Sequence, residues 1–245
     1  MRLQKFLSQA GICSRRKGEK YISDGLVTIN GIKVTHPGIQ VDTDVDMVCF
    51  RGDPVELLLD SEKIYIALNK PAGVVTSCSH KGEKIVLDMI DIPHRIYPVG
   101  RLDKDSSGLL LLTNDGELHN RLSHPSHNHE KEYVVTTVNP ISRGALGKMA
   151  AGIVLDGKKT RKATVTRLGP FKFNIVLKQG LNRQIRRMVQ KTGNSVDTLK
   201  RVRMGNIRLD SLKEGEWRYL TRDEVTALYC PLISEHKGSM PRVHG

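Results

Sequence analysis

The segment Gly100-Arg-Leu-Asp-Lys-Asp-Ser-Ser-Gly-Leu-Leu-Leu-Leu-Thr-Asn-Asp-Gly, residues 100–116, carries most of the information about fold and chemistry. It begins as a polar loop flanked by glycines and runs into the strand-sized apolar stretch 109–112. The loop holds two carboxylates, Asp103 and Asp105. A carboxylate placed there can act as nucleophile, acid or base, or can fix the loop through backbone hydrogen bonds. A metal is disfavoured, because the neighbouring basic side chains repel a cation.

Strands and helices on both sides of this segment follow each other irregularly, which predicts an α+β domain with a mixed, mainly antiparallel sheet. Its expected limits are residues 63–234, followed by a polar, disordered tail at 235–245. Apolar alternation and helical spacing predict the elements. Strands are expected near 64–68, 109–113, 132–137, 163–167 and 173–178, and helices near 115–123, 141–150, 183–192 and 221–228.

The first 48 residues predict a separate small domain built from a helix pair and a hairpin. Apolar residues recur at helical spacing over residues 2–10, and Ser14 is placed to cap a second helix that Gly25 closes. Asn30-Gly31 between two alternating segments predicts a type I′ hairpin turn. Residues 49–62, which end in acidic side chains, are expected to be a linker.

Charge favours a polyanionic partner. Lys and Arg number 39 against 26 Asp and Glu, a formal net charge of +13, and the cations concentrate in the first 33 residues and in 178–208. Each phosphate contact releases counterions, so such clusters favour nucleic acid. Three cations at a helix start are unfavourable unless an external anion compensates them. The candidate contacts in the N-terminal domain are Arg2, Lys5, Arg15, Arg16 and Lys17.

Composition also disfavours several other classes of protein. The four cysteines lie far apart without a CxxC pair, which fits neither a zinc site nor a disulfide framework. The histidines at 119, 124, 127 and 129 are irregularly spaced and are interpreted as loop residues, not metal ligands. No apolar run approaches the roughly 20 residues of a membrane helix, and the N-terminus lacks a signal-peptide pattern. We therefore expect a cytoplasmic protein without a metal.

The N-terminal residues resemble a known RNA-binding module. Arg2-Leu-Gln-Lys-Phe-Leu, Gly11-Ile-Cys-Ser-Arg-Arg and Gly25-Leu-Val-Thr-Ile-Asn-Gly are similar to the S4 domain over residues 1–48. This resemblance implies RNA as the partner but does not identify a reaction.

Four ordered motifs in the larger domain resemble the RsuA family of pseudouridine synthases, whose members carry an N-terminal S4 domain. Gly100-Arg-Leu-Asp before an apolar strand is similar to the active-site motif of that family. The others are Asn69-Lys-Pro-Ala-Gly-Val-Val, Lys131-Glu-Tyr-Val-Val and Gly180-Leu-Asn-Arg-Gln-Ile-Arg-Arg-Met. Together with the S4-like segment they cover most of the chain.

The resemblance implies a reaction without cofactor or metal, in which the uracil N1–C1′ bond is cleaved and the base is rejoined through C5. It assigns the nucleophile to Asp103 and leaves Asp105 a structural role. Tyr133 is expected to stack on the extruded uracil or to help remove the C5 proton. Arg186, the arginine after Gln-Ile, is expected to pair with Asp103 and keep it charged, with simple phosphate binding as the alternative.

Further residues of these motifs are expected to contact RNA. Arg183 and Arg187 are the better phosphate candidates on the arginine-rich helix, and Lys131 pairs with either an acid or a phosphate. The expected RNA contacts in this domain are Arg101, Lys104, Lys131, Asn182, Arg183, Gln184 and Arg187.

The expected substrate is a stem-loop of ribosomal RNA, since sequence-specific RNA recognition targets loops and bulges. The segment Asn128-His-Glu-Lys-Glu-Tyr resembles the large-subunit (23S) branch of the family most closely. A 16S or tRNA substrate remains open. Two rivals from other classes are a non-catalytic RNA-binding or ribosome-assembly factor and a nucleoside glycosidase, which also uses carboxylates at C1′. The protein is expected to be a monomer.

Overall fold

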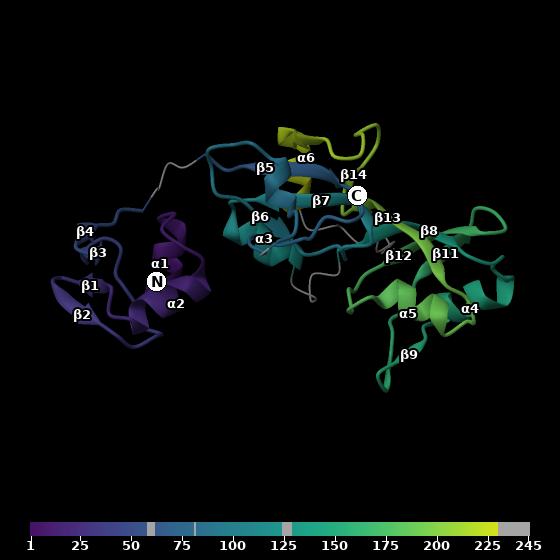
Figure 1. Ribbon diagram of the computed structural model, residues 1–245, viewed down its shortest axis with the longest axis horizontal. Helices are drawn as coiled ribbons and strands as arrows, with labels where there is room; N and C mark the ends of the chain where they lie inside the picture. Colours follow the sequence, from purple (N-terminus) through teal and green to yellow (C-terminus); the bar gives the residue numbers. More distant parts are fainter. Residues whose placement is uncertain (58–61, 81, 124–128, 230–245) are drawn as a thin grey trace, which may run out of the picture. The chain divides into compact units, whose positions relative to one another are not determined.

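The computed structural model describes residues 1–57, 62–80, 82–123 and 129–229, and the chain divides into two compact units, 1–62 and 63–245 (Figure 1). The predicted tail at 235–245 lies outside the described residues, as do His124 and His127. None of the described helices is long and apolar enough to cross a membrane.

The N-terminal unit packs two helices against a small antiparallel sheet. The helices are α1 (Leu3–Gln9) and α2 (Arg15–Ser23), and the Ser14 hydroxyl caps α2 by accepting from the Lys17 amide at 3.2 Å. Asn30 and Gly31 both have positive φ, +52° and +79°, as a type I′ turn requires. The predicted helix pair and hairpin are therefore confirmed. The sheet has the order β2-β1-β3-β4, formed by β1 (Val27–Ile29), β2 (Ile32–Val34), β3 (Val48–Phe50) and β4 (Asp53–Pro54).

The predicted linker at 49–62 is wrong in its first part. Strand β3 pairs with β1, and β4 pairs with β3, so residues 48–54 complete the N-terminal sheet. Val48 is buried in the core of this unit, together with Leu3, Leu7 and Val27. The acidic character of the segment concealed these short strands, because β3 buries one residue and both residues of β4 are exposed.

The C-terminal unit is built on one mixed, mainly antiparallel sheet, as predicted. Its main path runs β11-β12-β8-β13-β7-β5-β15, β14 pairs with β13 and β6 with β7, and the β13–β7 pair is parallel. The strands are β5 (Tyr65–Lys70), β6 (Tyr97–Val99), β7 (Ser107–Thr113), β8 (Lys131–Thr137), β11 (Thr164–Arg167), β12 (Lys172–Leu177), β13 (Val196–Met204), β14 (Ile207–Arg208) and β15 (Trp217–Tyr219), with a separate β9 (Val154–Leu155) and β10 (Lys158–Lys159) hairpin.

The uninterrupted leucine run of β7 is explained by burial on both faces of the sheet. Leu110 and Leu112 pack into a core with residues of β5 and of the 3₁₀ helix η1 (Val86–Met89). Leu109 and Leu111 face the opposite way and pack against α3 (Gly116–Ser123) and α6 (Arg222–Tyr229). A strand buried on both faces is expected to read as a continuous apolar stretch.

The other half of the sheet is covered by α4 (Arg143–Ala151) and α5 (Gln184–Gln190), which lie next to each other in Figure 1. Met149 of α4 and Met188 of α5 are fully buried against Phe173 and Ile175 of β12. This packing fixes the start of α5, and with it the arginine-rich segment, beside the end of the loop that precedes β7.

Strand β13 is central to the sheet, yet the sequence did not predict it. Its residues, Val196-Asp-Thr-Leu-Lys-Arg-Val-Arg-Met, include four charged side chains, and the cations among them were assigned to a basic surface cluster. That assignment is wrong for two of them. Arg201 is 1% exposed, and Arg203 forms ion pairs with Glu130 and Glu132 at 3.0 and 2.6 Å.

Candidate active site

The loop of residues 100–106 joins β6 to β7 and is held by hydrogen bonds from a neighbouring turn. Gly100 starts the loop at φ +69°, and the Ser106 amide donates to the Asp103 carbonyl at 3.0 Å. The Thr76 hydroxyl donates to the Leu102 carbonyl at 2.8 Å, and the Gly73 amide donates to the Lys104 carbonyl at 2.7 Å. The motif that begins at Asn69 therefore supports the loop that carries Asp103.

Lys70 also holds this loop in place through hydrogen bonds. Its ammonium group is fully buried and donates to the carbonyls of Ser106 and Pro71, both at 2.8 Å, and to that of Lys104 at 3.5 Å. Burial lowers the pKa of Lys70 to about 8, against the opposing charges of Asp105 and Asp103. The sequence contained this lysine within a recognised motif but gave no signal of its buried position.

The two loop carboxylates meet the arginines of the α5 start in an arrangement that differs from the one expected. Arg183 Nη1 lies 3.9 Å from Asp103 Oδ2, and the same guanidinium binds Asp105 with two hydrogen bonds at 3.2 and 3.0 Å. Arg186 lies 3.3 Å from Asp105 Oδ2 through Nε, and its Nη2 donates to the Asp105 carbonyl at 2.8 Å. The expected Arg186–Asp103 pair is therefore corrected to Arg183–Asp103.

Backbone geometry explains the correction. Arg183 precedes the first residue of α5 in a left-handed conformation, φ +47° and ψ +34°, which separates it from the regular helix. Arg186 lies within the first turn of α5, is only 13% exposed, and contacts the Val196 carbonyl at 3.4 Å as well as Asp105. Spacing along a regular helix could not predict which of the two guanidinium groups lies nearer to Asp103.

The arginines keep Asp105 ionised. Burial opposes ionisation of this carboxyl, but the hydrogen bond from Arg183 and the charge of Arg186 together lower its pKa below the ordinary value. Asp105 thus connects both arginines to the loop, whereas the ion pair of Asp103 with the described residues is the longer contact with Arg183.

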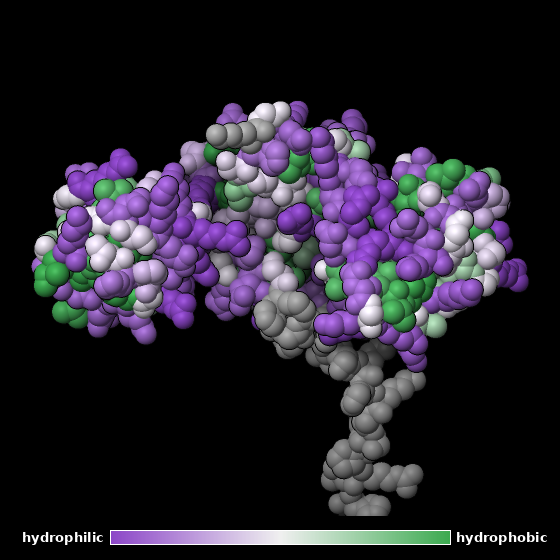
Figure 2. Space-filling view, turned by 60° about the horizontal axis from the view of Figure 1, so that its bottom comes forward, coloured by the Kyte–Doolittle hydropathy of each residue, from purple (hydrophilic) through white to green (hydrophobic). Residues whose placement is uncertain are grey.

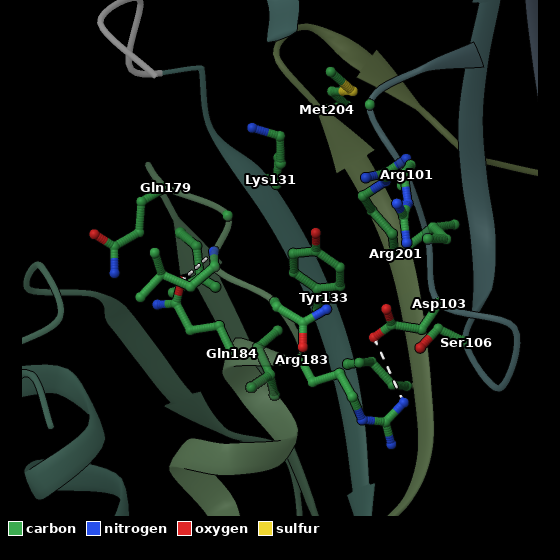
Figure 3. Close-up of a pocket in the computed structure, with 18 of the residues that line it drawn as sticks. Arg101, Asp103, Ser106, Lys131, Tyr133, Gln179, Arg183, Gln184, Arg201 and Met204 are labelled. Atoms are coloured by element: carbon green, nitrogen blue, oxygen red, sulfur yellow. Dashed lines mark hydrogen bonds and ion pairs between the residues drawn. The ribbon is translucent and has the colours of Figure 1, made fainter. Parts of the chain in front are cut away.

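A cavity of about 400 Å³ opens beside Asp103 (Figure 3). Tyr133 of β8 lies near its centre, with Lys131 two residues earlier on the same strand and Arg201 of β13 on the other side. Burial, and then the charge of Arg201, lower the pKa of Lys131. The expected site residues that line the cavity are Arg101, Asp103, Lys131, Tyr133, Asn182, Arg183 and Gln184.

Three expected residues of this unit do not line the cavity. Lys104 pairs with Glu83 at 3.0 Å, and Arg187 pairs with Asp156 at 2.5 Å. Arg186 instead lines a second, smaller cavity of about 240 Å³ together with Arg183 and Arg187. The described residues contain no cluster of three or more His, Cys, Asp or Glu side chains that could hold a metal ion.

The basic side chains expected in the N-terminal unit are on its surface. The first turn of α2 carries three exposed cations and no acidic residue, and Lys17 lies over the ring of Tyr21 at 5.4 Å. Figure 2 shows hydrophilic residues, interrupted by smaller hydrophobic patches, over the visible surface of both units. The exposed residues are Arg2, Lys5, Arg15, Arg16 and Lys17.

Comparison with known proteins identifies the family. Residues 64–191 match the family described as RNA pseudouridylate synthase, and residues 1–46 match the S4 domain. This chain belongs to the RNA pseudouridylate synthase family. A solved structure described as "Crystal structure of pseudouridylate synthase" superposes with a TM-score of 0.69 at 34% identity, covering 93% of this chain and 99% of that one.

Curated members of the family are similar over nearly the whole chain. The "Dual-specificity RNA pseudouridine synthase RluF" of Escherichia coli (strain K12) is 42% identical over 94% of this chain and 78% of its own length. The "Ribosomal large subunit pseudouridine synthase B" of Bacillus subtilis (strain 168) is 41% identical over 93% of this chain and 95% of its own. The expected enzyme class, an RNA pseudouridine synthase with an S4 domain, is therefore confirmed.

Proposed function

We propose that this pseudouridine synthase isomerises specific uridines of ribosomal RNA, with Asp103 as nucleophile and 23S rRNA as the substrate. The observation that carries the proposal is the position of the Asp103 carboxylate, which lines a cavity of about 400 Å³ together with Tyr133 and Arg183. The side chain of Asp103 is 28% exposed, so it is reachable from the cavity while most of its surface is protected from water.

Asp103 has the chemistry that the reaction requires. Its carboxylate oxygen attacks the nucleotide, either at C1′ with departure of the base or at C6 of the ring. Arg183, 3.9 Å away, supplies the positive charge that holds the carboxylate in place. Arg186 acts indirectly in this proposal, by fixing Asp105 and the backbone of the same loop. Asp105 is therefore a positioning residue.

Tyr133 is suited to receive the extruded base. A flipped base is read by stacking on an aromatic ring inside a pocket, and Tyr133 is the tyrosine that lines this cavity. Its hydroxyl is a candidate for removing the C5 proton after the new bond has formed. These steps need no cofactor, because uridine and pseudouridine have the same composition and oxidation state.

The exposed cations hold the RNA outside the cavity. Extruding a uridine costs a few kcal/mol, which phosphate contacts help to offset. The first turn of α2 offers three such cations on the S4 unit. Next to the cavity, Arg101, Asn182 and Gln184 offer donors. We propose that the enzyme acts as a monomer in the cytoplasm, where ribosomal RNA is found.

The choice of 23S rRNA rests on the names of the relatives. One relative is called a large-subunit enzyme, and others are called dual-specificity enzymes, so a second RNA substrate is compatible with the proposal.

The test uses unmodified 23S, 16S and tRNA transcripts that carry tritium at C5 of uridine. Formation of the C5–C1′ bond displaces that atom, so tritium release reports the isomerisation. We expect release from the 23S transcript. Release from 16S or tRNA alone would overturn the proposed target, and tight, salt-sensitive binding of all three without release would favour the binding-only rival. Liberation of free uracil would instead indicate a glycosidase.

A further inference from the structure

Arg201 is a cationic side chain buried in the wall of the active-site cavity, and it forms no ion pair with the part of the chain that the structure describes. The residue is 1% exposed, lines the cavity, and is the cross-strand neighbour of Tyr133. Its Nε donates to the Leu109 carbonyl at 2.6 Å, whereas its Nη2 is buried and has no hydrogen-bond partner. One side of the guanidinium is thus anchored to β7, and the other side offers an unused donor.

A glycine on the neighbouring strand β7 allows β13 to approach closely at Arg201. Gly108 pairs with Arg201 across the parallel β7–β13 contact and adopts φ +102°. A Cβ atom at Gly108 would lie 2.2 Å from the Arg201 carbonyl oxygen, so only glycine permits this approach. The Ser-Ser-Gly segment that follows Asp105 therefore positions Arg201 next to the loop of Asp103.

Among the described residues, no carboxylate lies within ion-pair distance of Arg201. Its positive charge contributes to the lowered pKa values of Lys70 and Lys131, which are themselves cations. Burying an unpaired charge and an unsatisfied donor is unfavourable. Such a group is expected where a ligand completes it.

We propose that Arg201 is a catalytic residue that donates a hydrogen bond from Nη2 to a ring carbonyl oxygen of the extruded uracil and stabilises the negative charge that develops on the ring. The inference rests on the proposed function, because it assumes that the cavity receives a uridine. Its ligand is the base. Because Nη2 is closed off from solvent before the base enters, the contact also requires the guanidinium to turn toward the cavity about its Nε–Leu109 anchor.

Negative charge reaches the ring oxygens by either route of attack. If the Asp103 oxygen bonds to C1′, the pair of the broken N1–C1′ bond stays on the ring and spreads to O2 and O4. If the oxygen bonds to C6, the pair of the C5–C6 double bond moves to O4. A fixed, desolvated guanidinium donor stabilises both arrangements.

The same donor serves substrate and product. Turning the uracil so that C5 replaces N1 exchanges the places of O2 and O4, so a carbonyl oxygen faces the donor before and after the turn. Cytosine presents an amino group in place of O4, and a guanidinium, which has no acceptor, cannot bind it there. Where O4 of the substrate is the contacted oxygen, Arg201 therefore also contributes to selection of uracil over cytosine.

The test measures single-turnover tritium release from the RNA that the native enzyme modifies, carrying uridine, 2-thiouridine or 4-thiouridine at the target position. Sulfur is the weaker acceptor, so the native enzyme is expected to prefer oxygen at the contacted position by about 10-fold. Arg201→Met is expected to react about 10- to 100-fold more slowly with uridine and to lose that preference. Arg201→Lys, which retains the charge, is expected to lie between the two.

The ratio of oxygen to sulfur rates is the decisive readout, because it is independent of the folded fraction. Arg203→Met is the control: Arg203 lies on the same strand but is held by Glu130 and Glu132 outside the cavity. It is expected to lower stability and leave the ratio unchanged. Native turnover of uridine with an unaltered ratio in both Arg201 variants would overturn this inference alone. Absence of native turnover on every RNA would overturn the proposed function instead.

Discussion

Arg183 bridges the two carboxylates of the active-site loop, lying 3.9 Å from Asp103 and 3.0 Å from Asp105. This relationship makes Arg183, not Arg186, the cation nearest to the proposed nucleophile. Since Asp105 holds the guanidinium with two hydrogen bonds, the three side chains form a connected unit whose members position one another.

Arg183→Gln is expected to lower the single-turnover rate about 100-fold, because the charge opposite Asp103 is lost. Its effect on thermal stability should be small, since the side chain is 45% exposed. Arg186→Gln should show the opposite pattern, with stability lowered by about 1–3 kcal/mol through its buried contacts and a smaller effect on rate. Single-turnover tritium release and thermal unfolding of both variants test these two expectations. The reverse ranking of rates would restore the pairing expected from sequence.

Replacing Tyr133 separates its two proposed roles. Tyr133→Phe keeps the ring and should bind RNA normally; if the hydroxyl removes the C5 proton, tritium release slows about 100-fold. Tyr133→Leu removes the ring and should also weaken binding of the extruded base by about 1–3 kcal/mol. Rates and affinities of the two variants are compared on one RNA. Equal, native-like release by Tyr133→Leu would show that neither role is needed.

Gly108→Ala is expected to destabilise the protein by roughly 3 kcal/mol or more, because the new Cβ meets the Arg201 backbone at 2.2 Å. Gly157→Ala is the matched control. Gly157 also has positive φ, +75°, but its Cβ would enter open space, so only the backbone strain of about 1 kcal/mol applies. Urea unfolding monitored by fluorescence measures both. Equal losses would mean that the strands do not approach as described.

Lys70 predicts a pH dependence of stability. The folded protein releases the Lys70 proton near pH 8, whereas an unfolded chain does so near 10.5. Between these values the unfolded chain binds more protons, so the free energy of unfolding gains a positive slope of up to about 1.4 kcal/mol per pH unit from this group. Below pH 8 both states are protonated and the slope vanishes.

The measurement compares urea unfolding of the native protein and Lys70→Met from pH 7 to 10.5. The free energy of unfolding of the native protein should rise relative to that of Lys70→Met as the pH increases from 8 to 10.5. A constant difference between the two proteins would contradict the lowered pKa of Lys70.

The sequence predicted the elements whose pattern reflects their burial. The leucine run of β7 and the helix α2 capped by Ser14 follow directly from periodicity and capping. The Gly-Arg-Leu-Asp loop, whose role the family resemblance implied, is adjacent to the cavity. The sequence did not predict strand β13, because its four charged residues are typical of a solvent-exposed segment. One of them, Arg201, is among the most buried side chains of the protein.

Tertiary contacts decided the remaining features. No local pattern distinguishes Arg183 from Arg186, because spacing does not reveal the left-handed backbone of Arg183 just before α5. The burial of Lys70 depends in the same way on carbonyls of Lys104 and Ser106, which are distant in sequence. Pairings of this kind follow from the fold and not from spacing.

The central claim is that Asp103 carries the chemistry while its neighbour Asp105 only supports it. The most direct measurement compares single-turnover tritium release by the native enzyme, Asp103→Asn and Asp105→Asn, with RNA affinity measured in parallel. We predict that Asp103→Asn abolishes release, by a factor of about 10⁴ or more, while binding RNA as tightly as the native enzyme. Asp105→Asn should retain measurable release. Residual release by Asp103→Asn equal to that of Asp105→Asn would contradict the account.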